Sequence, residues 1–212
     1  MKIKNIILDL GGVLLNLNYQ LTIDAFTALG IKDFQSLYTQ ANQTDIFNQI
    51  EKGEIKDGDF IKGLMSFLPK NTSTEDVTNA WNAMLLNFPA ERLAFLKKLK
   101  TNYNVVLLSN TNTIHLDYFH KDLKEKHGIE SLDDYFDHVY FSCDMGMRKP
   151  DSEIFEEVCK KENFTPEETL FIDDSIQHVE GAKAIGINAH LLDVKKTDVI
   201  QLVRSLLAKF NQ

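Results

Sequence analysis

The stretch "NIILDLGGVLLN", residues 5–16, sets the character of the chain. Its apolar run ends on one carboxylate, Asp9, and two glycines, Gly11 and Gly12, come before the apolar residues resume. Ile and Leu in a continuous run, without strict alternation, are typical of a strand that is buried on both faces of a parallel sheet. A charge at the end of such a strand, with side chains absent just beyond it, predicts that a ligand meets the sheet there.

The bulk properties of the chain predict a soluble globular protein. With 212 residues the chain is long enough for one domain and a modest insertion, and 43% of its residues are hydrophobic and 25% charged. A net charge of −8 argues against nucleic acid as a partner. No apolar run is long enough to span a bilayer, so no membrane association is expected. Cys143 and Cys159 lack metal-binding spacing, which favours reduced thiols in a cytoplasmic protein.

Further apolar segments predict more strands of the same sheet. They cover 104–110, 169–174 and 188–193, and a weaker fifth covers 138–142. Helical patterns alternate with them from about residue 89 onward, over 89–100, 151–163 and 175–186. Strands that alternate with helices predict an α/β fold, with a doubly wound and mostly parallel sheet.

Residues 18–88 break this alternation and contain no convincing strand. Amphipathic helical patterns cover 19–30, 44–53, 57–68 and 74–86. Ser73, with Asp76 three residues later, predicts a capping box at the start of the last of these helices. The sequence therefore predicts an all-helical cap domain over 18–88, inserted into an α/β core domain formed by 1–17 and 89–212.

Polar side chains follow the predicted strands at the point where each strand ends. Because the carboxyl ends of parallel strands meet at one edge of a sheet, we expect these side chains to lie close together. Carboxylates suit Mg²⁺, an ammonium offsets the charge of a phosphate, and glycines allow backbone N–H groups to approach phosphate oxygens. The residues are Asp9, Ser109, Asn110, Lys149, Asp173 and Asp174. Each alone would suit a cap or a turn, but their ordered recurrence favours a functional site.

Four motifs in this order resemble those of the haloacid-dehalogenase-like hydrolase superfamily. They are "DLGGV" (9–13), "LLSNT" (107–111), "GMRKP" (146–150) and "FIDDS" (171–175). The helical insertion resembles the cap that this superfamily places between its first and second motifs. Within the superfamily, the motifs look like those of bacterial sugar-1-phosphate phosphatases and of the amino-terminal phosphatase domain of soluble epoxide hydrolases.

The resemblance implies a Mg²⁺-dependent phosphatase that acts on a small phosphorylated metabolite, such as a hexose 1-phosphate. Asp9 would be the nucleophile and would form an aspartyl-phosphate. Asp9, the Gly11 carbonyl and Asp174 would hold Mg²⁺, and Asp173 would either bind it through water or orient Lys149. Lys149 would also neutralise the transition state. The substrate-binding positions that the resemblance implies are Leu10, Gly11, Ser109, Asn110 and Lys149.

The chain departs from the family pattern at Gly11, where most of the phosphatases carry an aspartate that acts as general acid and base. Such help is worth ~10²–10⁴-fold in rate. Three interpretations stay open: a phosphatase that tolerates the gap, a metal-independent 2-haloacid dehalogenase, and a non-catalytic module that binds phosphometabolites. The metal and phosphate residues favour the first, and Glu51, Glu54 and Asp57 are candidates for the missing group.

Four other side chains are candidates for supporting roles. His178, three residues after the "FIDDS" motif, fits either a hydrogen bond within the site or an exposed position on a helix. Trp81, Met84 and Phe88 are candidates to line the cleft between cap and core. The sequence makes no prediction about the oligomeric state.

Overall fold

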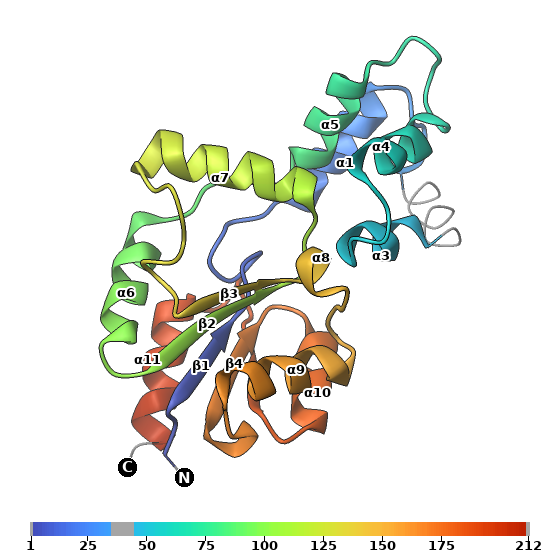
Figure 1. Cartoon of the computed structure of the whole chain (residues 1–212). Helices are drawn as coiled ribbons and strands as arrows, with labels where there is room; N and C mark the ends of the chain where they lie inside the picture. The colour runs from blue at the N-terminus through green and yellow to red at the C-terminus, as the bar shows by residue number, and fades with distance from the viewer. Residues whose placement is uncertain (1, 35–44, 211–212) are drawn as a thin grey trace.

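A five-stranded parallel sheet lies at the centre of the protein (Figure 1). The computed structural model describes residues 2–34 and 45–210. The strand order is β3-β2-β1-β4-β5, so β1 takes the middle position. The strands are β1 (Asn5–Leu8), β2 (Asn104–Ser109), β3 (His138–Phe141), β4 (Thr169–Asp173) and β5 (Asn188–Leu191). The predicted α/β class and parallel sheet are confirmed, including the weaker fifth strand.

Helices cover both faces of this sheet. On one face α6 (Ala90–Lys100), α7 (Thr113–His127) and α11 (Val199–Phe210) pack, and on the other lie α9 (Ser152–Glu162) and α10 (Ile176–Ala184). Two short elements lie in the connections: α8 (Ser142–Met145) between β3 and α9, and a 3₁₀ turn (Pro166–Glu168) between α9 and β4. Along β1, Ile6 and Leu8 point into the first layer and Ile7 into the second. Burial on both faces explains why the strands read as continuous apolar runs.

The last helix, α11, was not among the elements that the sequence analysis expected. It buries Val199, Val203 and Leu206 against the same layer as α6. These residues recur at helical spacing, so the signal was present in the sequence.

Four helices gather beyond the ends to which the strands point (Figure 1). They are α1 (Tyr19–Ala28), α3 (Ile46–Glu51), α4 (Asp57–Met65) and α5 (Thr74–Asn82). The predicted helices are present, although residue 44 of one of them lies outside the described residues. The capping box of Ser73 and Asp76 is confirmed. Phe26, Phe60 and Trp81 belong to a hydrophobic cluster separate from those of the sheet, which gives these helices a core of their own.

The two segments that join these helices to the sheet pair with each other. Leu17 and Leu85 form an antiparallel bridge, and the Asn16 amide donates to the Asn87 carbonyl at 3.0 Å. The Arg92 guanidinium donates to the Leu14 carbonyl at 3.0 Å, so it fixes the chain where it leaves the sheet. These contacts lead us to propose the domain boundaries predicted above, at 17/18 and 88/89.

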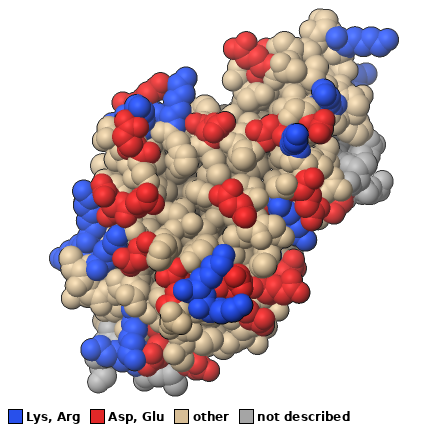
Figure 2. All heavy atoms as spheres, viewed as in Figure 1, with Lys and Arg blue, Asp and Glu red and all other residues tan. Residues whose placement is uncertain are grey.

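Charged side chains are mixed on the face that Figure 2 shows, with Lys and Arg among Asp and Glu. A face of this kind does not offer a phosphate backbone the clustered positive charge that it needs. Within residues 2–34 and 45–210, no helix combines the length and the apolar character that a bilayer crossing demands. Cys143 and Cys159 are both free thiols. The cytoplasmic location stays a prediction.

His115 joins the first turn of α7 to the last turn of α5. Its ring stacks on that of Trp81 with centroids 4.9 Å apart, and its Nδ1 lies 2.9 Å from the Asn82 Oδ1. Burial lowers the pKa of His115 to about 3. The folded protein therefore holds this imidazole neutral under conditions where the unfolded chain would protonate it.

Replacing His115 by Gln should flatten the acid limb of the stability curve. A histidine with a lowered folded pKa contributes stability that is present above its unfolded pKa, about 6.5, and is lost as the pH falls toward the folded pKa. The free energy of unfolding of the wild type should fall more steeply than that of His115→Gln, by up to about 1.4 kcal/mol per pH unit. Urea denaturation at several pH values between 4 and 7 measures both slopes. Parallel curves would contradict the buried neutral imidazole.

Candidate active site

A buried lysine connects two carboxylates where the central strands end. The Lys149 Nζ lies 2.7 Å from the Asp9 Oδ1 and 2.6 Å from the Asp173 Oδ2, and it donates to the Leu108 carbonyl at 2.9 Å. The side chain is fully buried. An ammonium group has three donors, and all three are used here. The sequence-predicted residues Asp9, Lys149 and Asp173 therefore meet at one point, although Asp9 and Asp173 lie 140 and 24 positions from Lys149 in the chain.

Asn110 holds the backbone of Lys149 in place. Its side-chain oxygen accepts a hydrogen bond from the Lys149 amide at 2.9 Å, and its side-chain nitrogen donates to the Lys149 carbonyl at 2.8 Å. The end of β2 is thereby tied to the loop before α9. Both polar atoms of the Asn110 side chain are hydrogen-bonded to Lys149. A phosphoryl oxygen bound here would therefore contact the backbone amide of Asn110 and not its side chain. Ser109, beside it, ends β2 and is buried.

Both oxygens of Asp173 are occupied by donors from the protein. The Oδ1 accepts from the Ser175 amide at 2.8 Å and lies 2.9 Å from the His178 Nδ1, and the Oδ2 accepts from Lys149. Of the two interpretations of His178, the hydrogen bond within the site is the one that the structure shows. Of the two roles considered for Asp173, this geometry fits the orientation of Lys149.

Asp174 lies directly against the glycine loop. A Cβ atom on Gly12 would sit only 2.0 Å from the Asp174 Oδ2, and the φ of Gly12 is +73°. Both facts require glycine at this position. At Gly11 a Cβ would meet only the tip of the flexible Leu17 side chain, at 2.8 Å. The second glycine therefore makes room for the carboxylate, a reason that the sequence analysis did not anticipate.

The three carboxylates of the acidic cluster differ in how readily they ionise. Burial raises the pKa of Asp9 to about 7, although Lys149 opposes the shift. Burial also disfavours the charged form of Asp173, but Lys149 and His178 outweigh it and lower that pKa to about 2. Burial and the neighbouring Asp173 raise the pKa of Asp174. Asp9, Asp173 and Asp174 each offer an oxygen within 4.8 Å of the others, so the donor set fits a hard divalent cation.

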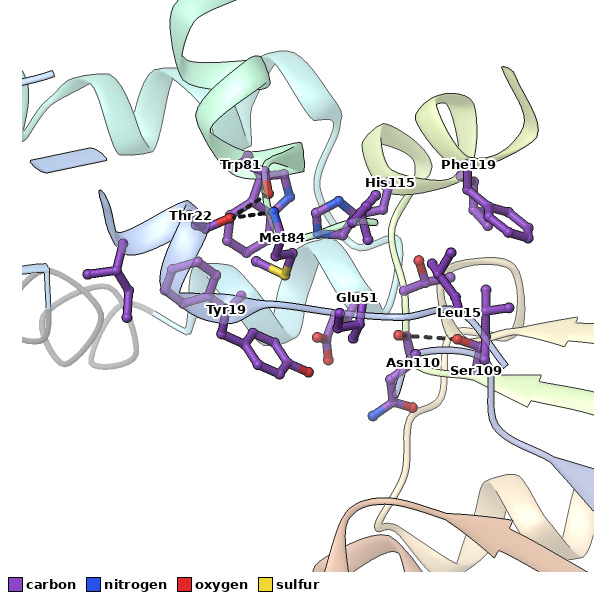
Figure 3. Close-up of a pocket in the computed structure, with 18 of the residues that line it drawn as sticks. Leu15, Tyr19, Thr22, Glu51, Trp81, Met84, Ser109, Asn110, His115 and Phe119 are labelled. Atoms are coloured by element: carbon purple, nitrogen blue, oxygen red, sulfur yellow. Dashed lines mark hydrogen bonds between the residues drawn. The ribbon is translucent and has the colours of Figure 1, made fainter. Parts of the chain in front are cut away.

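A pocket of about 390 Å³ opens beside this cluster, between the helical cap and the sheet (Figure 3). Leu10, Gly11, Ser109 and Asn110 line it from the sheet side. The predicted substrate-binding positions therefore face the pocket, except for the fully buried Lys149, which is not part of its lining. Most of the other walls are apolar: Leu15, Leu17, Ile23, Phe34, Phe47, Trp81, Met84, Leu85, Leu116 and Phe119. Tyr19, Thr22, Glu51, Thr111 and His115 complete the lining.

Some of the candidate residues named in the sequence analysis line the pocket, and others do not. Trp81 and Met84 line the pocket, whereas Phe88 is buried in the core of the sheet and does not. Glu51 lines the pocket, but Glu54 is exposed and Asp57 accepts a hydrogen bond from the Thr113 hydroxyl. The sequence analysis missed the pocket residues Tyr19, His115 and Phe119. Their common face depends on how α1 and α7 pack, which the sequence pattern does not reveal.

Comparisons with known proteins agree with this architecture. Residues 3–186 match the haloacid dehalogenase-like hydrolase family. A D-ribitol-5-phosphate phosphatase from Bacteroides thetaiotaomicron is 32% identical over 184 residues, which are 87% of this chain and 89% of that protein. A sesquiterpene phosphatase from Aspergillus oryzae is 32% identical over 191 residues, 90% of each chain.

A solved structure extends the similarity to three dimensions. The HAD family enzyme BT-2542 from Bacteroides thetaiotaomicron, in complex with magnesium and inorganic phosphate, has 36% sequence identity to this chain and a TM-score of 0.82. The match covers 92% of this chain and 96% of that one. The protein belongs to the haloacid dehalogenase-like hydrolase family, as the four motifs predicted.

Replacing Lys149 by Met should destabilise the protein strongly. The change leaves Asp9 and Asp173 buried side by side without their common cation, and breaking a buried ion pair in this way costs about 3–5 kcal/mol. Urea denaturation measures the loss. Lys160→Met is the matched control, because Lys160 contacts Glu157 at the surface and is 81% exposed, where such pairs are worth about 0–1 kcal/mol. Equal stabilities for the two variants would contradict the ionised buried cluster.

Proposed function

We propose that this hydrolase is a Mg²⁺-dependent phosphatase that acts on a small phosphomonoester through an aspartyl-phosphate. The observation that carries the proposal is the geometry around Lys149, which joins Asp9 to Asp173, with Asp174 in the same cluster and with Leu10 and Gly11, next to Asp9 in the chain, lining the pocket. Two phosphatases among the relatives and a phosphate complex among the similar structures support the same chemistry.

The residues divide the work as follows. Asp9 attacks phosphorus, and the bond between phosphorus and the ester oxygen breaks. Lys149 holds the Asp9 carboxylate in position and offsets negative charge. Ser109 and the backbone amides of Leu10, Gly11 and Asn110 would bind the phosphoryl oxygens.

Asp9, Asp174 and the Gly11 carbonyl would hold the magnesium ion, while Asp173 is committed to orienting Lys149. When bound, the ion offsets the combined charge of the phosphoryl group and the attacking carboxylate. The fit rests on the three clustered carboxylates and on the space that Gly12 leaves for Asp174.

A sugar or sugar-alcohol phosphate is our first candidate for the substrate, with hexose 1-phosphates among those to test. The relative that acts on D-ribitol 5-phosphate supports this class. The pocket favours a second candidate, the phosphate of an apolar alcohol, because its walls are mostly Leu, Ile, Phe, Trp and Met side chains. A sesquiterpene phosphatase among the relatives points in the same direction.

Phosphate release over a panel of substrates tests the proposal. The panel contains hexose 1-phosphates, ribitol 5-phosphate, an isoprenyl monophosphate and 2-chloropropionate, each with Mg²⁺ and with EDTA. We expect phosphate release that EDTA abolishes and that Asp9→Asn reduces to background while the melting temperature stays within a few degrees.

The other outcomes discriminate among the alternatives. Chloride release that EDTA does not affect would indicate the dehalogenase. Phosphometabolite binding without turnover of any substrate would indicate a binding module. Activity of Asp9→Asn near that of the wild type would refute the assignment of the nucleophile.

A paired glycine experiment tests the metal site. Gly12→Ala and Gly128→Ala each place a Cβ on a left-handed residue, with φ of +73° and +66°, at a similar backbone cost of about 1–2 kcal/mol. The new methyl group at Gly12 collides with Asp174, whereas nothing lies within 4 Å of the one at Gly128. We expect Gly12→Ala to weaken Mg²⁺ binding at least tenfold by calorimetry and Gly128→Ala to preserve it. Equal affinities would place the metal elsewhere.

A further inference from the structure

At the position two residues after its nucleophile, where most phosphatases of the family carry the acid and base, the proposed phosphatase has a glycine and therefore no side chain that could handle a proton. Gly11 occupies that position and lines the pocket. An alcohol leaves as a poor alkoxide unless it is protonated as the phosphorus–oxygen bond breaks, and the help of a general acid is worth ~10²–10⁴-fold. A group elsewhere in the pocket is therefore expected to supply the proton.

Glu51 is a carboxylate that the cap extends into this pocket. It is the last residue of α3, and it lines the same cavity as Gly11, Ser109 and Asn110. Figure 3 shows its side chain between the cap helices and the end of the sheet that carries Ser109 and Asn110. Its Oε2 atom is shielded from solvent and receives no hydrogen bond. The oxygen lies against the Arg148 guanidinium and keeps the capacity to accept a further hydrogen bond from a ligand or water.

Arg148 positions this carboxylate. The Arg148 Nη2 lies 2.8 Å from the Glu51 Oε2, in a charge contact whose angles are not those of a hydrogen bond. The other terminal nitrogen of Arg148 donates to Asn48, one turn earlier on α3. Because Arg148 directly precedes Lys149, the contact fixes α3 of the cap against the loop that carries the catalytic lysine.

The surroundings of Glu51 favour its protonated form more than water does. Burial raises its pKa, and the charges of Arg148, His178 and Lys149 oppose that shift without reversing it. These three groups are the charged neighbours that act on Glu51 from the loop before α9 and from α10. A group works best as acid and base when its pKa lies near the pH of the reaction.

Other groups near the pocket fit this role less well. Asp57 is bound to Thr113, and Glu54 is exposed and does not line the cavity. His115 lines it, but burial lowers its pKa to about 3 and its Nδ1 is engaged with Asn82, so it holds no proton to donate as an imidazolium.

We propose that Glu51 is the general acid and base of this enzyme, an inference that rests on the proposed phosphatase function. The Glu51 carboxyl group gives its proton to the ester oxygen as the phosphorus–oxygen bond breaks and the bond from Asp9 to phosphorus forms. The resulting carboxylate then takes a proton from water as the water oxygen bonds to phosphorus. The bond from Asp9 to phosphorus breaks, inorganic phosphate leaves, and both side chains return to their starting states.

Two substrates of similar shape test this role in Glu51→Gln. Phenol has an acidity near that of tyrosine, with a pKa of about 10, so phenyl phosphate needs the proton. The more acidic p-nitrophenol leaves without one. We expect kcat/KM for phenyl phosphate to fall at least tenfold further than kcat/KM for p-nitrophenyl phosphate, since this quantity covers the steps up to the first bond cleavage. Loss of the base should also cause a burst of p-nitrophenol equal to the enzyme concentration.

Matched variants separate chemistry from packing. Glu54→Gln, the same change three residues away, should leave kcat/KM for both substrates unchanged. Gly11→Asp in the Glu51→Gln background should restore much of the activity on phenyl phosphate, because its side chain displaces only the tip of Leu17. If Glu51→Gln fails to fold, Glu51→Asp gives the same comparison. Its shorter side chain displaces the carboxyl group, so kcat/KM should still fall further for phenyl phosphate than for p-nitrophenyl phosphate.

The outcomes distinguish this inference from the function on which it rests. Equal losses on the two substrates, with no burst, would reduce Glu51 to a partner of Arg148 and overturn the inference while leaving the phosphatase intact. A wild-type protein that releases phosphate from neither substrate, nor from the metabolite panel, would refute the proposed function itself.

Discussion

The contact between the Lys149 ammonium and the carboxylates of Asp9 and Asp173 is the constraint on which the rest of the structure depends. It joins the end of β1, the end of β4 and the loop before α9 at one buried point. An ammonium buried without partners would be prohibitively costly, so the ends of these strands must stay in register around it. Asn110 adds the end of β2 to the same junction. The site is therefore also a structural joint of the sheet.

The cap contributes a second layer of constraint. Its helices have their own hydrophobic cluster, yet they meet the core through paired linkers, through the stacking of His115 on Trp81, and through the ion pair of Glu51 with Arg148. The pocket lies where these contacts converge, so its shape depends on the packing of the cap. In this arrangement the core carries the acidic cluster, and the cap supplies Glu51 and most of the apolar walls of the pocket on its side.

The polarity of the site changes over a short distance. At the sheet edge the buried Asp9, Asp173 and Lys149 lie together with the more accessible Asp174, whereas the walls toward the cap are mostly apolar. A phosphate ester has the same division, with a charged end and an organic group. An apolar wall also excludes water and strengthens the electrostatic interactions within the site. This match of polarity links the fold to the proposed hydrolysis.

The sequence by itself determined the parallel sheet, the helical insertion and the set Asp9, Ser109, Asn110, Lys149, Asp173 and Asp174, because buried strands and their polar ends follow from local pattern. The tertiary structure alone decided that both oxygens of Asp173 are occupied, that Gly12 makes room for Asp174, and that Glu51 faces the pocket while Asp57 and Phe88 do not. Such distinctions depend on contacts between residues far apart in the chain. Periodicity fixes which face of a helix is apolar, but only packing fixes what that face meets.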